Sequence, residues 1–333
     1  MTEIRPGGSG VAQAPAPAGT FAAAPLRRVR VALPSRNPQF LAFWVALASG
    51  MFTAAGLQLD LTLAPEQLGA PVALCTGQAD IALLPPPLYL RLIAGRQPVV
   101  CFANLLRNDP VNVVLTEGAA ARVGMVPGLP TAEAIRRLEG LRLGLAPGPT
   151  RRLRALGAWA GSDPAAIEIV TLPGPEQNPA FGGGAVDGLY AHTPHLERAL
   201  VDDLGCLAVH ASRGDIPPTS VAQIHAAVAS RDFAREAPEA IDALVGCLAL
   251  AMEVLGDADP RAAEALVTWG FPGLNRVHLD RTLEVYRPAI PPSPQVTPKG
   301  LREADVFSGG AAGIDRLSED DLAPFIWSDA WPG

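Results

Sequence analysis

The 333-residue sequence is poor in several features, and each shortage excludes a class of protein. Basic residues number 26 against 33 acidic ones, which gives a formal net charge of −7, whereas nucleic-acid binding requires a basic surface. Proline, glycine or charged residues interrupt every apolar run before it is long enough to span a bilayer. We therefore expect a globular protein with no nucleic-acid partner and no insertion into a membrane.

Cysteine is also scarce, and its spacing is not that of a metal site or a redox pair. The four cysteines stand apart among apolar neighbours, without the two-residue separation of zinc and redox motifs. We predict four small buried thiols, with a Cys75–Cys101 disulfide as the alternative. His192 and His195 are close in sequence, but no carboxylate or cysteine near them completes the three protein ligands that zinc needs. No metal and no cofactor are therefore expected.

Established catalytic motifs are missing as well. The sequence has no nucleophile elbow, no phosphate-binding glycine loop and no pair of carboxylates at a suitable spacing. The glycines at 182–184 precede a predicted strand and do not separate a strand from a helix, so they indicate a turn. An enzymatic role therefore has no motif in its favour.

Apolar residues are plentiful, and they indicate a folded chain of two parts. They make up 49% of the sequence against 18% charged residues, which is enough for real cores, and the length predicts two lobes. Residues 1–25 are rich in glycine, proline and alanine and have neither an apolar core nor twin arginines, so we expect a flexible leader and not an export signal. On this basis the protein is expected in the cytoplasm, or in the periplasm if the native N-terminus has been replaced.

From residue 29 onward, short apolar strands alternate with helices, which predicts two doubly wound α/β lobes joined by a two-strand hinge. Lobe 1 is expected to comprise residues 26–115 and 212–333, including C-terminal helices and a clasp at 325–331, and lobe 2 residues 116–211. The chain is expected to cross near Leu115 and near His210. Strands are predicted at 29–33, 57–63, 81–84, 98–103, 111–115, 141–146, 167–172 and 206–211, the last returning to lobe 1. Helices are predicted at 40–51, 72–75, 131–138, 151–161, 221–234, 238–255, 261–268 and 281–286.

A short internal repeat supports two lobes built on one plan. Gly77-x-Ala79-Asp80 is followed by an apolar strand and a proline-containing loop, and so is Gly184-x-Val186-Asp187. The two copies fall at matching places in successive α/β units. Both aspartates lie at predicted turns from helix to strand, which favours a structural role over a catalytic one.

These patterns together resemble a known family. The segments that carry the resemblance are Ser49-Gly50-Met51-Phe52 with Gly56-Leu57, the Gly77 copy of the repeat with Gly95-x-x-Pro98-Val99-Val100, Leu138-x-Gly140-x-x-x-Gly144, and the Gly184 copy. They are similar to motifs of the sulfonate, taurine, nitrate and thiamine-precursor family of ABC-transporter solute-binding proteins, over roughly residues 28–300. The resemblance implies the type II periplasmic-binding fold, capture of a ligand by lobe closure, and an ABC permease as partner.

Candidate ligand-binding residues follow from the predicted fold, because ligands of open α/β sheets bind beyond the carboxyl ends of the strands. Arginines and backbone N–H groups there would hold an anion, and apolar walls with Tyr190 would select the rest of the molecule. Each loop also has an ordinary explanation as a solvated turn, a chain terminator or a helix cap. The candidates are Ser35, Arg36, Asn37, Pro85, Pro86, Arg107, Asn108, Pro149, Thr150, Arg151, Tyr190, His192 and Thr193.

The function favoured by these features is capture of a small anionic organic molecule between two lobes. Two alternatives remain open. A lyase or decarboxylase on the same fold would use His192, with Asn37 or Arg36, as its acid–base and carboxylate-anchoring groups. A ligand sensor would instead pass lobe closure to a regulatory partner.

Overall fold

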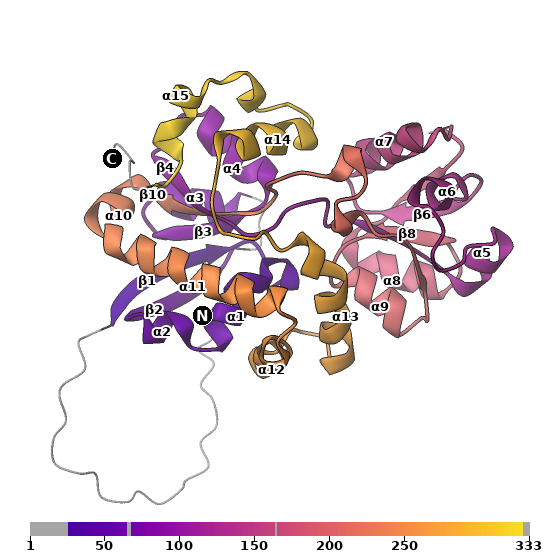
Figure 1. The fold of residues 1–333 in the computed structure, drawn as a ribbon, viewed down its shortest axis with the longest axis horizontal. Coiled ribbons are helices and arrows are strands. Elements are labelled where there is room, and N and C mark those ends of the chain that lie inside the picture. The colour runs from indigo at the N-terminus through magenta and orange to yellow at the C-terminus, as the bar shows by residue number, and fades with distance from the viewer. Residues whose placement is uncertain (1–25, 65–67, 164, 329–333) are drawn as a thin grey trace, which may run out of the picture.

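A computed structural model describes residues 26–64, 68–163 and 165–328, and these form two lobes that each contain a five-stranded sheet (Figure 1). This confirms the predicted pair of α/β lobes. The predicted leader at residues 1–25 lies outside the described residues, as does the end of the predicted clasp. Among the described helices, none has both the length and the apolar character needed to cross a bilayer.

The first lobe surrounds a sheet in the order β2–β1–β3–β10–β4. Its strands are β1 Arg27–Leu33, β2 Leu57–Leu63, β3 Ile81–Leu84, β4 Val99–Asn104 and β10 Ala226–Ser230. Its α-helices are α1 Leu41–Ala48, α2 Met51–Ala54, α3 Gly69–Cys75, α4 Pro86–Ala94, α10 Arg231–Glu236, α11 Pro238–Gly256, α12 Pro260–Trp269, α13 Arg276–Tyr286, α14 Pro298–Ser308 and α15 Glu319–Leu322. Short 3-10 turns are η1 Pro38–Phe40, η4 Arg287–Ala289, η5 Ile314–Arg316 and η6 Ala323–Phe325.

The second lobe repeats this arrangement with the sheet order β7–β6–β8–β5–β9. Its strands are β5 Asn112–Leu115, β6 Arg142–Leu145, β7 Glu168–Thr171, β8 Gly188–Ala191 and β9 Cys206–Val209. Its helices are α5 Glu117–Arg122, α6 Thr131–Arg136, α7 Thr150–Ala160, α8 Gly174–Gly182 and α9 His195–Val201. Two 3-10 turns, η2 Ala211–Arg213 and η3 Pro217–Thr219, lead back toward the first lobe.

The repeated aspartates hold equivalent strands together in the two lobes. Asp80 accepts a hydrogen bond from the backbone N–H of Arg30 on β1 at 2.7 Å, and Asp187 accepts one from the backbone N–H of Arg142 on β6 at 2.8 Å. In each sheet the first three strands are parallel, and the fourth is antiparallel to both neighbours. The structure therefore shows one plan used twice, with both aspartates at the turn from helix to strand.

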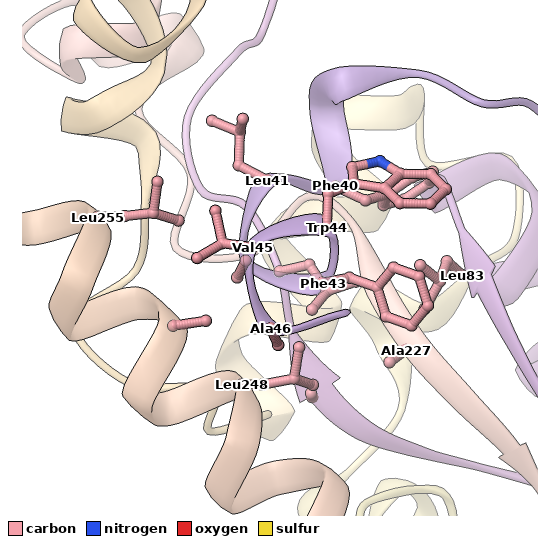
Figure 2. Close-up of a cluster of buried hydrophobic side chains, with 14 of the residues drawn as sticks. Phe40, Leu41, Phe43, Trp44, Val45, Ala46, Leu83, Ala227, Leu248 and Leu255 are labelled. Carbon is pink, nitrogen blue, oxygen red and sulfur yellow. The ribbon is translucent and has the colours of Figure 1, made fainter. Parts of the chain in front are cut away.

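Helix α1 is largely buried, because its sequence is apolar on every face. It lies between the sheet and α11, and Figure 2 shows Val45 turned toward Leu255 of α11 and Phe43 toward Leu83 of the sheet. The indole Nε1 of Trp44 donates a hydrogen bond to the carbonyl of Asn37 at 2.7 Å. The loop that follows β1 is therefore fixed to the core.

Three predictions are wrong: one about a helix, one about where the chain crosses between the lobes, and one about the burial of the cysteines. Residues 226–230, predicted as part of a helix, form β10, because pairing with β3 and β4 overrides the helix preference of this alanine-rich segment. Residues 111–115 were assigned to lobe 1 and 206–211 were expected to return there. Instead β5 and β9 pair with each other in the second sheet, so the chain crosses before β5. The four cysteines are free thiols with no Cys75–Cys101 disulfide, but Cys75 is exposed, and Cys206 is half-buried where it packs against the core of the second lobe.

The C-terminal segment extends the first sheet. Ile326 forms a parallel bridge to Cys101 at the edge of β4, and the backbone N–H of Trp327 donates to the carbonyl of Cys101 at 2.9 Å. The Trp327 indole also donates to Asp242 of α11 at 3.0 Å. This contact covers an edge strand that would otherwise expose unpaired backbone groups.

Candidate functional site

A cavity of about 580 Å³ lies between the lobes, in the size range of small-molecule sites. It is bounded by the loops that follow β3, β6 and β8, which is the strand end where ligands of such sheets bind. Its lining comprises residues 85–87, 146–149, 151–152 and 190–192, the crossing residues 110–111 and 224–225, and Gln39, Gln177, Phe307 and Ser308.

Two crossing segments form the back of the cavity and pair with each other. The backbone N–H of Leu105 donates to the carbonyl of His225 at 2.8 Å, and that of Asn108 donates to the carbonyl of Val221 at 2.8 Å. The predicted site residues Arg107 and Asn108 belong to this hinge and do not line the cavity. Arg107 Nε donates to the carbonyl of Pro288, and Asn108 Nδ2 to the carbonyl of Ser212. Both side chains therefore brace the hinge.

The structure brings together six of the thirteen predicted site residues. Pro85 and Pro86 begin α4, Pro149 and Arg151 begin α7, and the other two follow β8. These six cavity-lining residues are Pro85, Pro86, Pro149, Arg151, Tyr190 and His192. Ser35 and Thr150 are exposed outside the cavity lining, at the loop after β1 and at the first residue of α7.

Arg36 and Asn37 contact other residues of the protein and do not line the cavity. The guanidinium of Arg36 lies 4.9 Å from the Trp269 ring and donates to the Trp269 carbonyl at 2.7 Å. Asn37 Oδ1 accepts from the N–H of Gln39, and its Nδ2 donates to the carbonyl of Thr193 at 3.2 Å. Thr193 is buried, and its N–H donates to the Tyr286 hydroxyl. Asn37 and Thr193 therefore join the two lobes.

Sequence reasoning missed the main polar network at the cavity. The Asp109 carboxylate, in the hinge and fully buried, accepts from Arg152 Nη1 at 3.0 Å and from the Tyr190 hydroxyl at 2.8 Å. Burial, together with the charge of Asp109, holds the pKa of Tyr190 well above its usual value, so this hydroxyl stays a donor. Arg152 also stacks 4.7 Å over the Phe307 ring. The signal in the sequence that could have indicated Arg152 is its position next to Arg151, a predicted site residue.

Arg151 connects the lobes at the mouth of the same cavity. Its Nη2 donates to the carbonyls of Val306 at 3.0 Å and Phe307 at 2.7 Å, near the end of α14. A cation at a helix C-terminus is favoured by the helix dipole. Since these hydrogen-bond partners are carbonyls and not carboxylates, the charge of Arg151 is not neutralised by an acid.

Two neutral imidazoles line the inner part of the cavity. His192 Nδ1 lies 2.6 Å from the carbonyl of Thr193, and because a carbonyl only accepts, Nδ1 carries the proton and Nε2 is an acceptor. Burial lowers the pKa of His192. Burial, with the nearby charges of His192 and Arg152, lowers the pKa of His225 to about 3, and His225 Nδ1 is buried without a hydrogen-bond partner.

His195 takes no part in the cavity. It lies outside the lining, where its Nδ1 contacts Asn178 Oδ1 at 2.9 Å, and burial lowers its pKa to about 4. No three histidines, cysteines or acids within residues 26–64, 68–163 and 165–328 are grouped so that they could hold a metal ion.

Comparisons with known proteins identify the family and the fold. The sequence model described as NMT1/THI5 like matches residues 37–255. A sequence search of the curated proteins finds no match. Among solved structures, the chain is similar to the periplasmic aliphatic sulphonate binding protein SsuA from Escherichia coli, with 14% identity, a TM-score of 0.62, and 92% of this chain and 99% of that chain covered.

Two further structures share the fold. One is the ligand-binding component of an ABC-type import system from Staphylococcus aureus, with 13% identity, a TM-score of 0.65, and 92% and 98% of the two chains covered. The other is the desulfurization enzyme DSZB, with 15% identity, a TM-score of 0.58, and 88% and 94% covered. The family resemblance inferred from the sequence is thus confirmed: the chain belongs to the NMT1/THI5-like family and has the two-lobed periplasmic-binding-protein fold.

Proposed function

We propose that the protein captures a small anionic organic molecule between its lobes, as the solute-binding component of an ABC importer. The observation that carries this proposal is the cavity of about 580 Å³ to which both lobes and the hinge contribute walls. Family membership supports it, and so does the similarity to a sulphonate-binding protein and to the ligand-binding component of an import system. The partner is accordingly an ABC permease.

The charge on the cavity wall favours an anion. Arg151 and Arg152 are the charged residues among those that line it. Asp109 neutralises Arg152, whereas Arg151 contacts only carbonyls, so the wall carries about one excess positive charge. In a partly enclosed site this charge attracts an anionic group more strongly than it would in water.

Capture and release depend on contacts that join the lobes around the cavity. Arg151 reaches the end of α14, Asn37 reaches Thr193, and α9 packs against α13, which lies beside it in Figure 1. These contacts must break before the lobes can separate. A ligand that touches both lobes stabilises the joined state through its differential affinity.

Native mass spectrometry of the gently purified protein, followed by thermal-shift measurements, tests the proposal. A co-purified molecule that raises the unfolding midpoint and is recovered unchanged supports capture. Stimulation of the ATPase activity of a candidate permease in proteoliposomes distinguishes an importer component from a protein that only binds. Binding of neutral or cationic compounds alone contradicts the anionic part of the proposal.

A second candidate function is catalysis, and one observation favours it. His192 Nε2 is an unprotonated acceptor on the wall of the cavity, as a general base requires. The description of one similar structure as a desulfurization enzyme shows that this fold hosts catalysis. Chemical alteration of the co-purified molecule, abolished in His192→Phe and kept in His195→Phe, would favour this function over capture.

A further inference from the structure

Helix α4 starts at the edge of the cavity but offers no free backbone donor to a ligand. Residues 85–87 are all prolines and have no N–H. The next two N–H groups, of Leu88 and Tyr89, both donate to the carbonyl of Pro85, at 3.0 and 3.4 Å. The N-terminal turn of α4, which in most helices is a ready anion site, therefore has no unoccupied N–H.

The start of α9 is occupied in the same way. The N–H of Thr193 donates to the Tyr286 hydroxyl at 2.9 Å, Pro194 has none, and the N–H groups of His195 and Leu196 donate to the carbonyl of His192. At the start of η1, Asn37 accepts the N–H of Gln39. Of these helix starts at the cavity, α7 is the one left to supply backbone N–H donors for an anion.

At α7 the arrangement is different. No hydrogen bond within the described structure uses the backbone N–H groups of Thr150 and Arg151, whereas those of Arg152 and Leu153 donate to the carbonyl of Pro149. The side chains of Arg151 and Arg152 lie on the same turn and line the cavity. Thr150 lies outside the cavity lining, so one anionic group can be bound here by the Arg151 N–H and the guanidinium groups together.

The other polar groups of the cavity suit a hydrogen-bond donor. His192 presents its Nε2 lone pair, and Gln177 donates its Nε2 to the carbonyl of Leu172, which leaves its Oε1 to accept. His225, 4% exposed, also lines the cavity and has an unpartnered Nδ1. Because these imidazoles are neutral, they supply no cation for a second anionic group.

We infer that the cavity takes a molecule with a single anionic head, a carboxylate or a sulfonate, on an apolar body that carries a hydroxyl or amino donor, and that it rejects dianions. The head binds at the start of α7, the donor binds the acceptors around His192, and the body packs against the prolines and Phe307. This inference rests on the proposed capture between the lobes and adds the class of molecule captured.

Isothermal titration of the full chain with four probes on one aromatic body tests it. The probes are 4-hydroxybenzoate, benzoate, terephthalate and phenol, each at millimolar concentration, with 4-hydroxybenzenesulfonate to identify the head. We expect 4-hydroxybenzoate to bind about tenfold more tightly than benzoate, which lacks the donor, and than phenol, which lacks the charge. Terephthalate lacks the donor and adds a second charge, so we expect it to bind more weakly than benzoate.

The outcomes separate this inference from the proposed function. Terephthalate binding as tightly as benzoate, or phenol binding as tightly as 4-hydroxybenzoate, overturns the inference, while capture between the lobes stands. Absence of binding by every probe counts against both.

Two histidine variants provide a matched comparison. His192→Phe should abolish the advantage of 4-hydroxybenzoate over benzoate, because it removes the acceptor. His195→Phe, at the first residue of α9 and outside the cavity lining, should keep it. Retention of the advantage in His192→Phe overturns the assignment of the donor subsite. If that variant does not fold, the four probes on the unmodified protein still decide the class of molecule.

Discussion

Replacing Asp109 with asparagine probes the network that connects the hinge to the cavity. The buried carboxylate accepts hydrogen bonds from Arg152 at 3.0 Å, from the Val111 N–H at 3.0 Å and from the Tyr190 hydroxyl at 2.8 Å. Asparagine keeps the size but removes the charge that balances Arg152, and its amide nitrogen cannot accept the Tyr190 proton. Breaking a buried ion pair by removing one partner costs about 3–5 kcal/mol.

We expect the lower end of that range for Asp109→Asn. The Asp109 side chain is fully buried, but that of Arg152 is 22% exposed, so water screens part of the lost interaction. The expected loss in the free energy of unfolding is therefore about 3 kcal/mol. Urea denaturation of the full chain, followed by circular dichroism, measures it as a lower midpoint with an unchanged slope.

Asp280→Asn is the matched control. Asp280 pairs with Arg276 at 2.8 Å, but both side chains are about half exposed, and such pairs contribute less than about 1 kcal/mol. A double-mutant cycle of Asp109→Asn with Arg152→Gln should show losses that do not add, because each change removes the same interaction. If Asp109→Asn lowers the midpoint no more than Asp280→Asn, or if the two losses add, the buried pair does not stabilise the hinge.

Three more predictions follow from single side chains. Arg151→Ala should weaken binding of 4-hydroxybenzoate about tenfold in titration calorimetry, whereas Arg36→Ala, a change outside the cavity lining, should not. Pro87→Ala restores one N–H at the start of α4 and should strengthen terephthalate binding a few-fold. Burial raises the pKa of Glu197 to about 7, so as the pH rises this carboxyl group ionises in the unfolded chain before it ionises in the folded chain. The stability of the folded chain therefore falls as the pH rises from about 4.5 to about 7. In urea denaturation at pH 8, the free energy of unfolding of Glu197→Gln should therefore exceed that of the unmodified protein by up to about 3 kcal/mol.

The two-lobed fold was predictable because its signals are local. Apolar strands such as 81–84 end at prolines, and the repeated Gly-x-x-Asp marks the same turn in both lobes. Asp80 and Asp187 meet their partners on the neighbouring parallel strand of the same unit. The exception, β10, has the composition of a helix and becomes a strand only because β3 and β4 leave a place between them for small residues.

The site was predictable only in part, because the direction of a long side chain is not a local property. The loops after β3, β6 and β8, which carry predicted site residues, line the cavity. Arg36, however, turns to Trp269, and Arg107 to Pro288, partners that lie far along the sequence. Nothing in the neighbourhood of either arginine distinguishes it from Arg151, whose guanidinium does line the cavity.

The ion pair of Asp109 and Arg152, which the sequence analysis did not predict, illustrates the same limit. Asp109 and Arg152 belong to the hinge and to α7, and they meet only when the second lobe has folded against the crossing segment. The sequence marks both as charged residues beside predicted site residues, but it gives no reason to pair them with each other.

The prolines of the cavity connect sequence to specificity more directly than the arginines do. A proline at a helix start has one certain consequence, the loss of an N–H, and this consequence does not depend on where any side chain turns. Once β3 is known to end at Leu84 and α4 to begin at Pro86, the absence of donors at residues 85–87 follows from the sequence alone. The same reasoning applies to Pro149 at α7, but there the next two residues restore the N–H groups. The inferred selectivity for one anionic group over two therefore depends on which residues at the starts of α4 and α7 are prolines.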